Sequence, residues 1–556
     1  MIMKELSKIN KLIFVCLLIV FGFTSTTTAQ NFPPLSVVIH DSAATQGYYF
    51  IIPYTSTAPY IYDHPQLILD KFGRMIFYRF SRAGANPNTT IDFKLQPNGL
   101  MSYFDINRGR YYLMDSSFMV VDSISCTNGF VTDQHDMQVL LDGNYLLFGT
   151  ETRIMNLTSY AWFGFNHTLP GSANAEVLGV VIQEFNQNKE LIWEWKSHDH
   201  YSFADVNPVW LFSPSKVDWT HANAVEKDMD GNVLISLRHF NEITKIDYST
   251  GNILWRLGGK QNQFTFLNDP LRFTGQHDVR RVSDTSISLY DNGQYTNPPM
   301  SRGLEYALDE TNKTANLVWE YIYDSSMSSI ACGNHQYIEN TNHLVDFGYV
   351  SAGFPWMVVV KPDKSKVMEM FFPNNYISYR AFNYPTLPWQ LNRPTINCEQ
   401  IGDSYYLVAE PGYSEYRWTN GGTTQSIPIT EPGSYGVFVP YGSGFLCSEF
   451  IEVSDISNPC LYLSEPDHNL PKEFSFTCFP NPATNQINVK ISLPSKTKLQ
   501  ICLYNMMGTE VLKPLERLYA YGEHGLSMDI SALKPGIYYL VLTADNTRNV
   551  KKLIIQ

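Results

Sequence analysis

The sequence predicts an all-β protein made of a six-bladed β-propeller, an immunoglobulin-like sandwich and a last β-sandwich. Helical periodicity is scarce, whereas the chain holds 35 Tyr and 33 Phe, residues that favour strands. Short apolar strands separated by turns recur through residues 30–388, and the composition changes after Pro388. A chain of 556 residues is also too long for one ordinary domain.

The first 29 residues are predicted to be a signal peptide, cleaved after Ala29. Lys4, Lys8 and Lys11 precede an apolar run at 12–23, which is too short to span a bilayer comfortably. We therefore expect a secreted or cell-surface protein that is exported through the periplasm and is not an integral membrane protein. The net charge of −13 argues against a nucleic-acid partner.

Two markers recur along residues 30–388 and predict repeated four-stranded units. The first is an Asn- or Gly-containing turn between two apolar strands, at 96–99, 141–144, 230–232 and 339–342. The second is an apolar pair followed by Trp and a charged residue, at Trp193, Trp255 and Trp319. Repeats on the scale of tens of residues indicate a propeller or a solenoid, and the strand pattern favours the propeller.

Four histidines occupy the same place in their units, each at the start of the first strand: His135, His221, His277 and His335. The first strand of each propeller blade lines the central axis, so we expect these side chains to converge. Arg238 ends the strand that follows His221, where it can turn over the same channel mouth. One histidine in a strand is more often structural, but four in register favour a shared site.

Imidazoles and a guanidinium suit an anionic substrate group. Arginine matches the oxygens of sulfate, phosphate or carboxylate, and neutral histidine can act as a nucleophile or proton carrier. Three imidazoles could instead hold zinc or copper. The arginine argues against a metal, and strand alternation directs Asp136 and Asp278 to the opposite face. No G-x-S-x-G, P-loop or dinucleotide motif is present in the sequence.

Residues 389–453 are predicted to form an immunoglobulin-like domain, followed by a linker at 454–472. Trp418 lies between Cys398 and Cys447, as expected for a tryptophan packed on a disulfide of such a sandwich. The alternative is two unrelated cysteines in a linker.

The last segment, residues 473–556, has strand patterning typical of a small β-sandwich. Its segments FPNPA, LYNMMG and LKPGIYYLVL closely resemble the C-terminal sorting domain of the type IX secretion system of Bacteroidota. That resemblance implies export across the outer membrane and the type IX machinery as a partner. An ordinary accessory sandwich is the alternative.

Several propeller segments resemble the bacterial arylsulfate sulfotransferases, as a divergent branch: 221–225, 236–239, 246–247, 255–259 and 276–278. The resemblance implies a six-bladed propeller that transfers sulfuryl groups from an aryl sulfate to a phenol without a nucleotide donor. It implies that His277 is the nucleophile and forms sulfohistidine, and that His221 carries the proton. His135 and Arg238 would hold the sulfuryl oxygens.

Asn223 and His335 complete the expected site as substrate-binding residues, although the resemblance gives His335 no role. We expect ping-pong kinetics, no cofactor and no metal. A surface propeller that binds a sulfated or anionic glycan without turning it over is the main alternative. A lyase or hydrolase that uses the same histidines on a carbohydrate is another.

Overall fold

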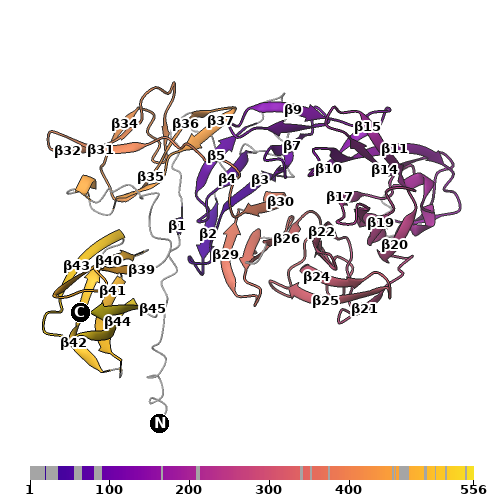
Figure 1. Cartoon of the computed structure of the whole chain (residues 1–556). Coiled ribbons are helices and arrows are strands. Elements are labelled where there is room, and N and C mark those ends of the chain that lie inside the picture. Colours follow the sequence, from indigo (N-terminus) through magenta and orange to yellow (C-terminus); the bar gives the residue numbers. More distant parts are fainter. Residues whose placement is uncertain are drawn as a thin grey trace, which may run out of the picture. The chain divides into compact units, whose positions relative to one another are not determined.

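The protein is built almost wholly of strands in two compact units, residues 1–456 and 457–556 (Figure 1). The computed structural model describes residues 19–20, 35–55, 65–80, 90–164, 167–207, 213–338, 342–350, 353–372, 376–453, 456, 459–461, 475–493, 497–506, 509–519, 522–544 and 547–556. Helical structure in these ranges consists of the single 3₁₀ turns η1 (Ser197–Asp199), η2 (Phe203–Asp205), η4 (Arg238–Phe240) and η5 (Pro459–Leu461). A search of the described residues finds no helix long and apolar enough to cross a membrane.

Six sheets of four or more described strands make up most of the first unit, and Figure 1 shows them arranged around a common centre. From the centre outward, the first three are β30 (Tyr376–Tyr384), β3 (Tyr48–Thr55), β4 (Gln66–Leu69) and β5 (Met75–Arg79); β6 (Thr90–Leu95), β7 (Met101–Asp105), β8 (Arg110–Met114) and β9 (Val120–Ile124); and β10 (Val131–Val139), β11 (Tyr145–Met155), β14 (Ala175–Phe185) and β15 (Leu191–Lys196).

The remaining three are β17 (Ala222–Lys227), β18 (Val233–Leu237), β19 (Glu242–Ile246) and β20 (Ile253–Gly258); β22 (His277–Ser283), β23 (Ser286–Asp291), β24 (Arg302–Asp309) and β25 (Thr314–Tyr321); and β26 (Asn334–Ile338), β27 (Asn342–Asp346), β28 (Met357–Val360), β29 (Lys366–Phe371) and β2 (Ser36–Ile39). Smaller strands attach at the rim: β12 (Ala161–Gly164) pairs with β13 (His167–Pro170), β16 (Lys216–Asp218) with β14, and β21 (Thr265–Leu267) with β25.

Strands from opposite ends of this segment close the ring. β30 is the innermost strand of the first sheet, where it pairs with β3, and β2 is added outside β29 in the sixth sheet. Each pair of neighbouring sheets shares one buried apolar cluster, and the sixth sheet packs in the same way on the first. Because successive side chains of a strand point to opposite faces of the sheet, each sheet has two apolar faces, and one packs on each neighbouring sheet.

Both sequence markers lie where the repeat predicts them in the described residues; most of the turn at 339–342 lies outside these. The turns at Gly99, Gly143 and Gly231 join the first and second strands of their sheets, and each glycine has a positive φ. Each marker tryptophan lies on the fourth strand of its sheet, counted from the centre. Its indole N–H donates to the turn before the fourth strand of the next sheet: Trp193 to Tyr248 O at 2.9 Å, Trp255 to Glu310 Oε2 at 2.9 Å, and Trp319 to Pro362 O at 3.1 Å.

Residues after Pro388 extend the first sheet. β37 (Gly444–Cys447) pairs with β5 and leads through β36 (Val437–Tyr441) to β33 (Arg417–Trp418). The other strands form small sheets: β31 (Ile396–Ile401), β32 (Ser404–Ala409) and β34 (Ser426–Pro428), and β35 (Gly433–Tyr435) with β38 (Ile451–Val453).

The predicted bridge between Cys398 and Cys447 is wrong. Cys447 is a buried free thiol, whereas Cys398 and Cys460 are disulfide-bonded. The physical reason is that Cys398 lies on β31, in a separate sheet, while the Cys447 side chain joins the apolar core between the sixth and first sheets. Trp418 therefore does not pack on a Cys398–Cys447 bridge, and its indole N–H donates to Thr424 O at 2.8 Å.

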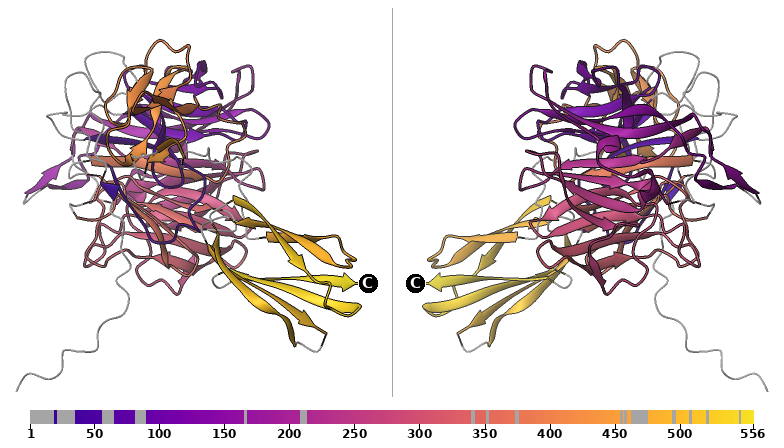
Figure 2. Two further views of the ribbon diagram at one scale, coloured as in Figure 1. Left: turned by 90° about the vertical axis from the view of Figure 1, so that its left-hand side faces the viewer. Right: turned by 90° about the vertical axis from the view of Figure 1, so that its right-hand side faces the viewer.

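The second unit has its own core and two sheets, whose strands are yellow and gold in Figure 2. One sheet contains β39 (Ser475–Phe479), β40 (Gln486–Leu493) and β43 (Gly522–Asp529). The other contains β42 (Glu510–Tyr519), β41 (Thr497–Asn505), β44 (Gly536–Ala544) and β45 (Thr547–Ile555). The predicted signal peptide lies outside the described residues except for β1 (Ile19–Val20), and most of the linker at 454–472 lies outside them too.

Candidate active site

The site histidines lie at irregularities of the innermost strands. The pairing of β10 with β11 shifts register between Thr132 and Met137, around His135. The pairing of β22 with β23 shifts directly after His277, and Asp278 has a φ of 56°. His221 precedes β17 with a φ of 45°, ahead of a further shift between Ala222 and Ala224. Such bulges re-aim side chains that regular alternation would direct into the sheet interfaces.

Three imidazoles form a row at the centre of the circle of six sheets. The ring centroid of His221 lies 4.9 Å from that of His135 and 4.5 Å from that of His239. Two of these rings have carboxylate partners close in sequence: His135 Nδ1 is 2.6 Å from Asp133 Oδ1, and His221 Nδ1 is 2.5 Å from Asp218 Oδ2. A carboxylate accepts hydrogen bonds, so each pair places a proton on Nδ1 and directs Nε2 away from the carboxylate.

Arg238 adds a guanidinium beside this row. It begins η4, directly after β18, and its backbone N–H donates to His221 O at 3.1 Å. Its Nη1 donates to His239 Nε2 at 3.1 Å, and its Nη2 donates to Ile330 O at 3.0 Å. The residue is only 8% exposed, so its charge acts in a setting of low dielectric.

His277 is fully buried and lies within electrostatic reach of Arg238, His221 and His135. Its Nδ1 lies 2.6 Å from Asn292 Oδ1 and 3.1 Å from Gly275 O, two atoms that only accept hydrogen bonds. The proton of the neutral ring is therefore on Nδ1, and the Nε2 lone pair is available for bond formation.

The imidazoles differ in protonation because their surroundings differ. Burial and the Arg238 charge hold the pKa of His277 well below its ordinary value. Burial also lowers the pKa of His221, outweighing the charge of Asp218. For His135, burial opposes protonation, but the charge and hydrogen bond of Asp133 outweigh it, so its pKa is raised. The surroundings thus favour the protonated form of His135 and the neutral forms of His221 and His277.

Asn223 and His335, both expected to bind substrate, have different surroundings. Asn223 lies within the bulge of β17, and its Nδ2 donates to Gln276 O at 2.8 Å, so it ties the innermost strands of two sheets next to His277. His335 lies in β26, whose pairing with β27 has no register shift. Its ring stacks on Trp319 and its Nε2 lies 3.0 Å from His343 Nδ1, so His335 packs between strands rather than with the other three histidines.

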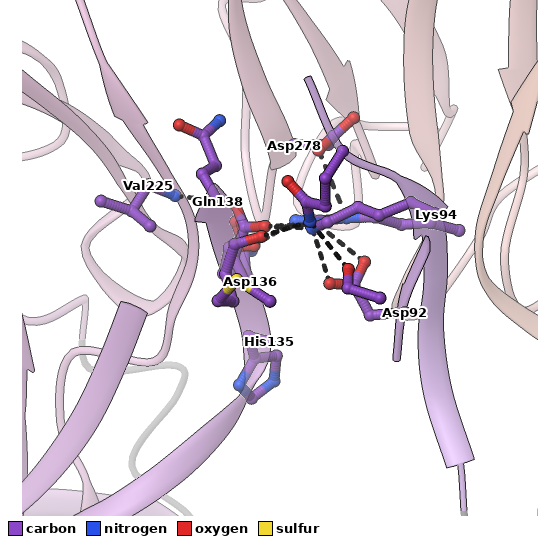
Figure 3. Close-up of polar contacts among 12 residues, drawn as sticks. Asp92, Lys94, His135, Asp136, Gln138, Val225 and Asp278 are labelled. Atoms are coloured by element: carbon purple, nitrogen blue, oxygen red, sulfur yellow. Dashed lines mark hydrogen bonds and ion pairs between the residues drawn. The ribbon is translucent and has the colours of Figure 1, made fainter. Parts of the chain in front are cut away.

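A buried ionic cluster occupies the same innermost strands (Figure 3). Asp136 binds Lys94 at 2.6 Å, Arg280 at 2.8 Å and Arg380 at 3.2 Å. Asp92 and Asp278 complete the set, so three carboxylates meet three cations. Figure 3 shows His135 on the same strand as Asp136 but directed away from the cluster. Asp136 and Asp278 therefore bind cations instead of joining the histidines.

Asp218, His221 and His239 could hold a metal ion, since one ligand atom of each lies within 4.8 Å of the others. The donor set fits a cation poorly. His239 Nδ1 is 2.6 Å from Asp218 O and its Nε2 accepts from Arg238, so both ring nitrogens are engaged. A metal would also lie beside a guanidinium. The chemistry of these donors favours an anion.

Sequence reasoning missed four polar partners of the site: Asp133, Asp218, His239 and Asn292. Asp133 and Asp218 precede their histidines by two and three residues, so a search for local Asp–His spacing would find them. His239 adjoins Arg238. Asn292 is separated from His277 by a whole hairpin, and the sequence holds no local signal for it.

The geometry defines a class: an all-β ring of sheets whose centre brings together several histidines and an arginine. Comparison with known protein families identifies the family. The chain belongs to the arylsulfotransferase (ASST) family, whose model matches residues 38–380, and residues 477–556 match the secretion system C-terminal sorting domain. The protein is thus a member of a sulfotransferase family. It also carries a type IX sorting domain, which directs it to the cell surface or to secretion.

No curated protein matches the chain. Among solved structures, a protein of unknown function from Bacteroides caccae is 11% identical, with a TM-score of 0.36, over 60% of this chain and 98% of that one. Virginiamycin B lyase from Staphylococcus aureus is 11% identical, with a TM-score of 0.27, over 62% and 79%. An auxiliary nutrient binding protein from Bacteroides ovatus is 10% identical, with a TM-score of 0.29, over 72% and 95%. Likeness at this level does not bear on the site.

Proposed function

We propose that the protein transfers a sulfuryl group from an aryl sulfate to a phenolic acceptor through sulfohistidine at His277, without metal or nucleotide. The observation that carries this proposal is a buried, neutral imidazole whose Nδ1 is engaged and whose surroundings supply the Arg238 charge. A neutral ring with a free lone pair is a nucleophile, and a positive site attracts the sulfate monoester.

In the first step, the Nε2 lone pair of His277 forms a bond to sulfur while the bond from sulfur to the aryl oxygen breaks. The aryl oxygen leaves with the electron pair. When the phenol is a poor leaving group, this oxygen takes the Nε2 proton of the doubly protonated form of His221, which is paired with Asp218, and the ring is left neutral. In the second step, an acceptor phenol gives its proton to His221, and its oxygen displaces the His277 nitrogen from sulfur. Two half-reactions that share one intermediate give ping-pong kinetics.

The other polar residues stabilise charge or hold geometry. Arg238 and His135 bind the sulfuryl oxygens as charge redistributes in the transition state, and Asp133 favours the protonated form of His135. Asp218 fixes the orientation and tautomer of His221, as a carboxylate does for a histidine base. Asn223 holds the strand that carries His277. We assign His335 to packing.

We assign the chemistry to a six-bladed propeller over residues 30–388, with an immunoglobulin-like segment at 389–453 and the sorting domain at 473–556. The blade count is supported by six sheets and six shared cores among the described residues. The second segment contributes β37, β36 and β33 to the first sheet, which supports a role in bracing the propeller.

The test is release of nitrophenol from 4-nitrophenyl sulfate by the full chain, with and without phenol and with and without EDTA. We expect turnover that rises with phenol and is unaffected by EDTA. His277→Ala should abolish it, whereas His200→Ala, an exposed histidine stacked on Trp195 of the third sheet, should not. Absence of turnover with any phenol would favour an anion-binding propeller, and loss of activity in EDTA would favour a metal site.

A further inference from the structure

Two histidines of the site make the same contact with different chemistry. His135 Nδ1 faces a carboxylate oxygen of Asp133 at 2.6 Å, and His277 Nδ1 faces an amide oxygen of Asn292 at 2.6 Å. The carboxylate adds a negative charge and favours the protonated ring, whereas the amide orients its ring without adding charge. The choice of amide at His277 therefore bears on which form of the ring is populated.

The surroundings of Asn292 fix which amide atom faces His277. Asn292 is fully buried, and its Nδ2 donates to Cys332 O at 3.1 Å and to Ser329 Oγ at 3.2 Å. Cys332 O can only accept a hydrogen bond, so the NH₂ group must point to it and Oδ1 must point to His277. The Ser301 hydroxyl holds this arrangement: it donates to Asn292 O at 2.7 Å and accepts from Ser329 N at 2.7 Å.

We propose that Asn292 is the positioning residue that keeps His277 in its neutral, Nδ1-protonated tautomer and so presents the Nε2 lone pair to sulfur. This inference rests on the proposed function for its catalytic meaning, but the tautomer can be measured without turnover. Asn292 follows β23, and the segment 329–332 that orients it precedes the next innermost strand, so two sheets cooperate in setting one ring.

The charged and titratable groups that face His277 are Arg238, His221 and His135, all of which disfavour a second proton on the ring. Asn292 and Gly275 O supply the acceptors for Nδ1. A carboxylate in place of Asn292 would stabilise the protonated ring and so raise the pH below which the Nε2 lone pair is lost. It would also stabilise the sulfo-imidazole intermediate and so slow transfer to the acceptor.

The test exchanges the amide and the carboxylate that face the two Nδ1 atoms. Asn292→Asp keeps the shape and adds the charge, and ¹⁵N-histidine NMR of the full chain follows the titration of His277. We expect its pKa to rise by about one to three units, as for other rings that gain a carboxylate. The acid limb of kcat/KM should move up in pH by the same amount, and activity should recover at alkaline pH because the geometry is retained. Asp133→Asn should shift His135 in the opposite direction.

Two further variants keep the proposal testable if Asn292→Asp folds poorly. Ser329→Ala removes one hydrogen bond to the Asn292 amide and should give a mixture of His277 tautomers with a smaller loss of kcat. Asn292→Ala should lower kcat about 10- to 100-fold with KM little changed. An unchanged His277 titration in Asn292→Asp, together with an unchanged His277 tautomer in Asn292→Ala, would overturn the proposal even if sulfuryl transfer is confirmed. A shifted titration in a protein without turnover would uphold it and overturn the proposed function instead.

Discussion

Four histidines hold equivalent positions in four sheets, and their nearest polar neighbours give each ring a different chemistry. Asp133 raises the pKa of His135 against the effect of burial, whereas burial lowers that of His221 despite Asp218. Burial and Arg238 lower the pKa of His277. His335 is buried against Trp319, and burial lowers its pKa to about 4. Residue type alone therefore does not assign the roles.

His221→Ala should lower the rate of sulfuryl transfer from a donor, and the loss should be larger the more basic the leaving phenolate is. With phenyl sulfate, whose phenol has a pKa near 10, loss of the proton donor should lower the single-turnover rate about 10²- to 10⁴-fold. With 4-nitrophenyl sulfate, which releases a stable anion, the loss should be small. Rapid-quench measurement without acceptor compares the two donors. An equal loss for both would show that His221 does not move the proton.

The sequence predicted the register of the histidines but not their partners. Strand periodicity and the repeat place His135, His221 and His277 on innermost strands, and that placement is local information. Whether a side chain reaches the centre depends on bulges, which β10, β17 and β22 have next to their histidines and which the pairing of β26 with β27 lacks. No residue type in the four segments indicates which strands have a bulge, so the sequence pattern does not separate His335 from the other three histidines.

The innermost strands are also held together by charge. Burial alone would raise the pKa of Asp136, but Arg280, Lys94 and Arg380 outweigh it and hold the pKa well below its ordinary value. The group therefore contributes stability that is present above the unfolded pKa of about 4 and is lost as pH falls below it. Partners from β6, β22 and β30 mean that this one carboxylate joins four sheets at their inner edges.

Arg380→Met should destabilise the first unit by about 3–5 kcal/mol, because it leaves buried carboxylates without one of their cations. Thermal unfolding monitored by circular dichroism measures the change. Arg108→Met is the matched control, since Arg108 is half-exposed and pairs with Asp105 at 3.5 Å; it should cost less than about 1 kcal/mol. Equal effects of the two changes would contradict a structural role for the cluster.

At the level of strands, the turns and outer tryptophans were predictable because their signals are local. The extension of the first sheet by β37 was not, because β37 lies more than 360 residues after β5 and no periodicity reports such pairing. The failure of the predicted Cys398–Cys447 bridge has the same origin. A Cys–Trp–Cys order specifies spacing along the chain, whereas bridging depends on which sheet each cysteine joins.

The site residues and the sorting domain belong to different units of the molecule. All the site residues belong to the first unit, and the second unit has its own apolar core, formed within residues 476–555. The sorting domain was recognisable from three short segments that lie within the residues matched by the sorting-domain family, 477–556. The family of the first unit was recognisable from segments around the site, where chemistry restricts residue choice.

A chain ending at Lys472 should keep full activity, within about twofold, and lose export to the cell surface. This end point retains both Cys398 and Cys460, the disulfide-bonded cysteines, so the truncation leaves their chemistry intact. Activity of the purified shortened protein and its location in cells give the two readouts. A folded truncation with little activity would show that the second unit contributes to catalysis.

In the proposed mechanism, His277 carries the sulfuryl group between two phenols. The direct measurement is mass spectrometry of the His277 peptide after the protein is mixed with 4-nitrophenyl sulfate without acceptor and quenched at alkaline pH. We predict one sulfuryl group on His277, formed as one equivalent of nitrophenol is released and lost on addition of phenol. Turnover with an unmodified His277, or with the group on another residue, would contradict the account.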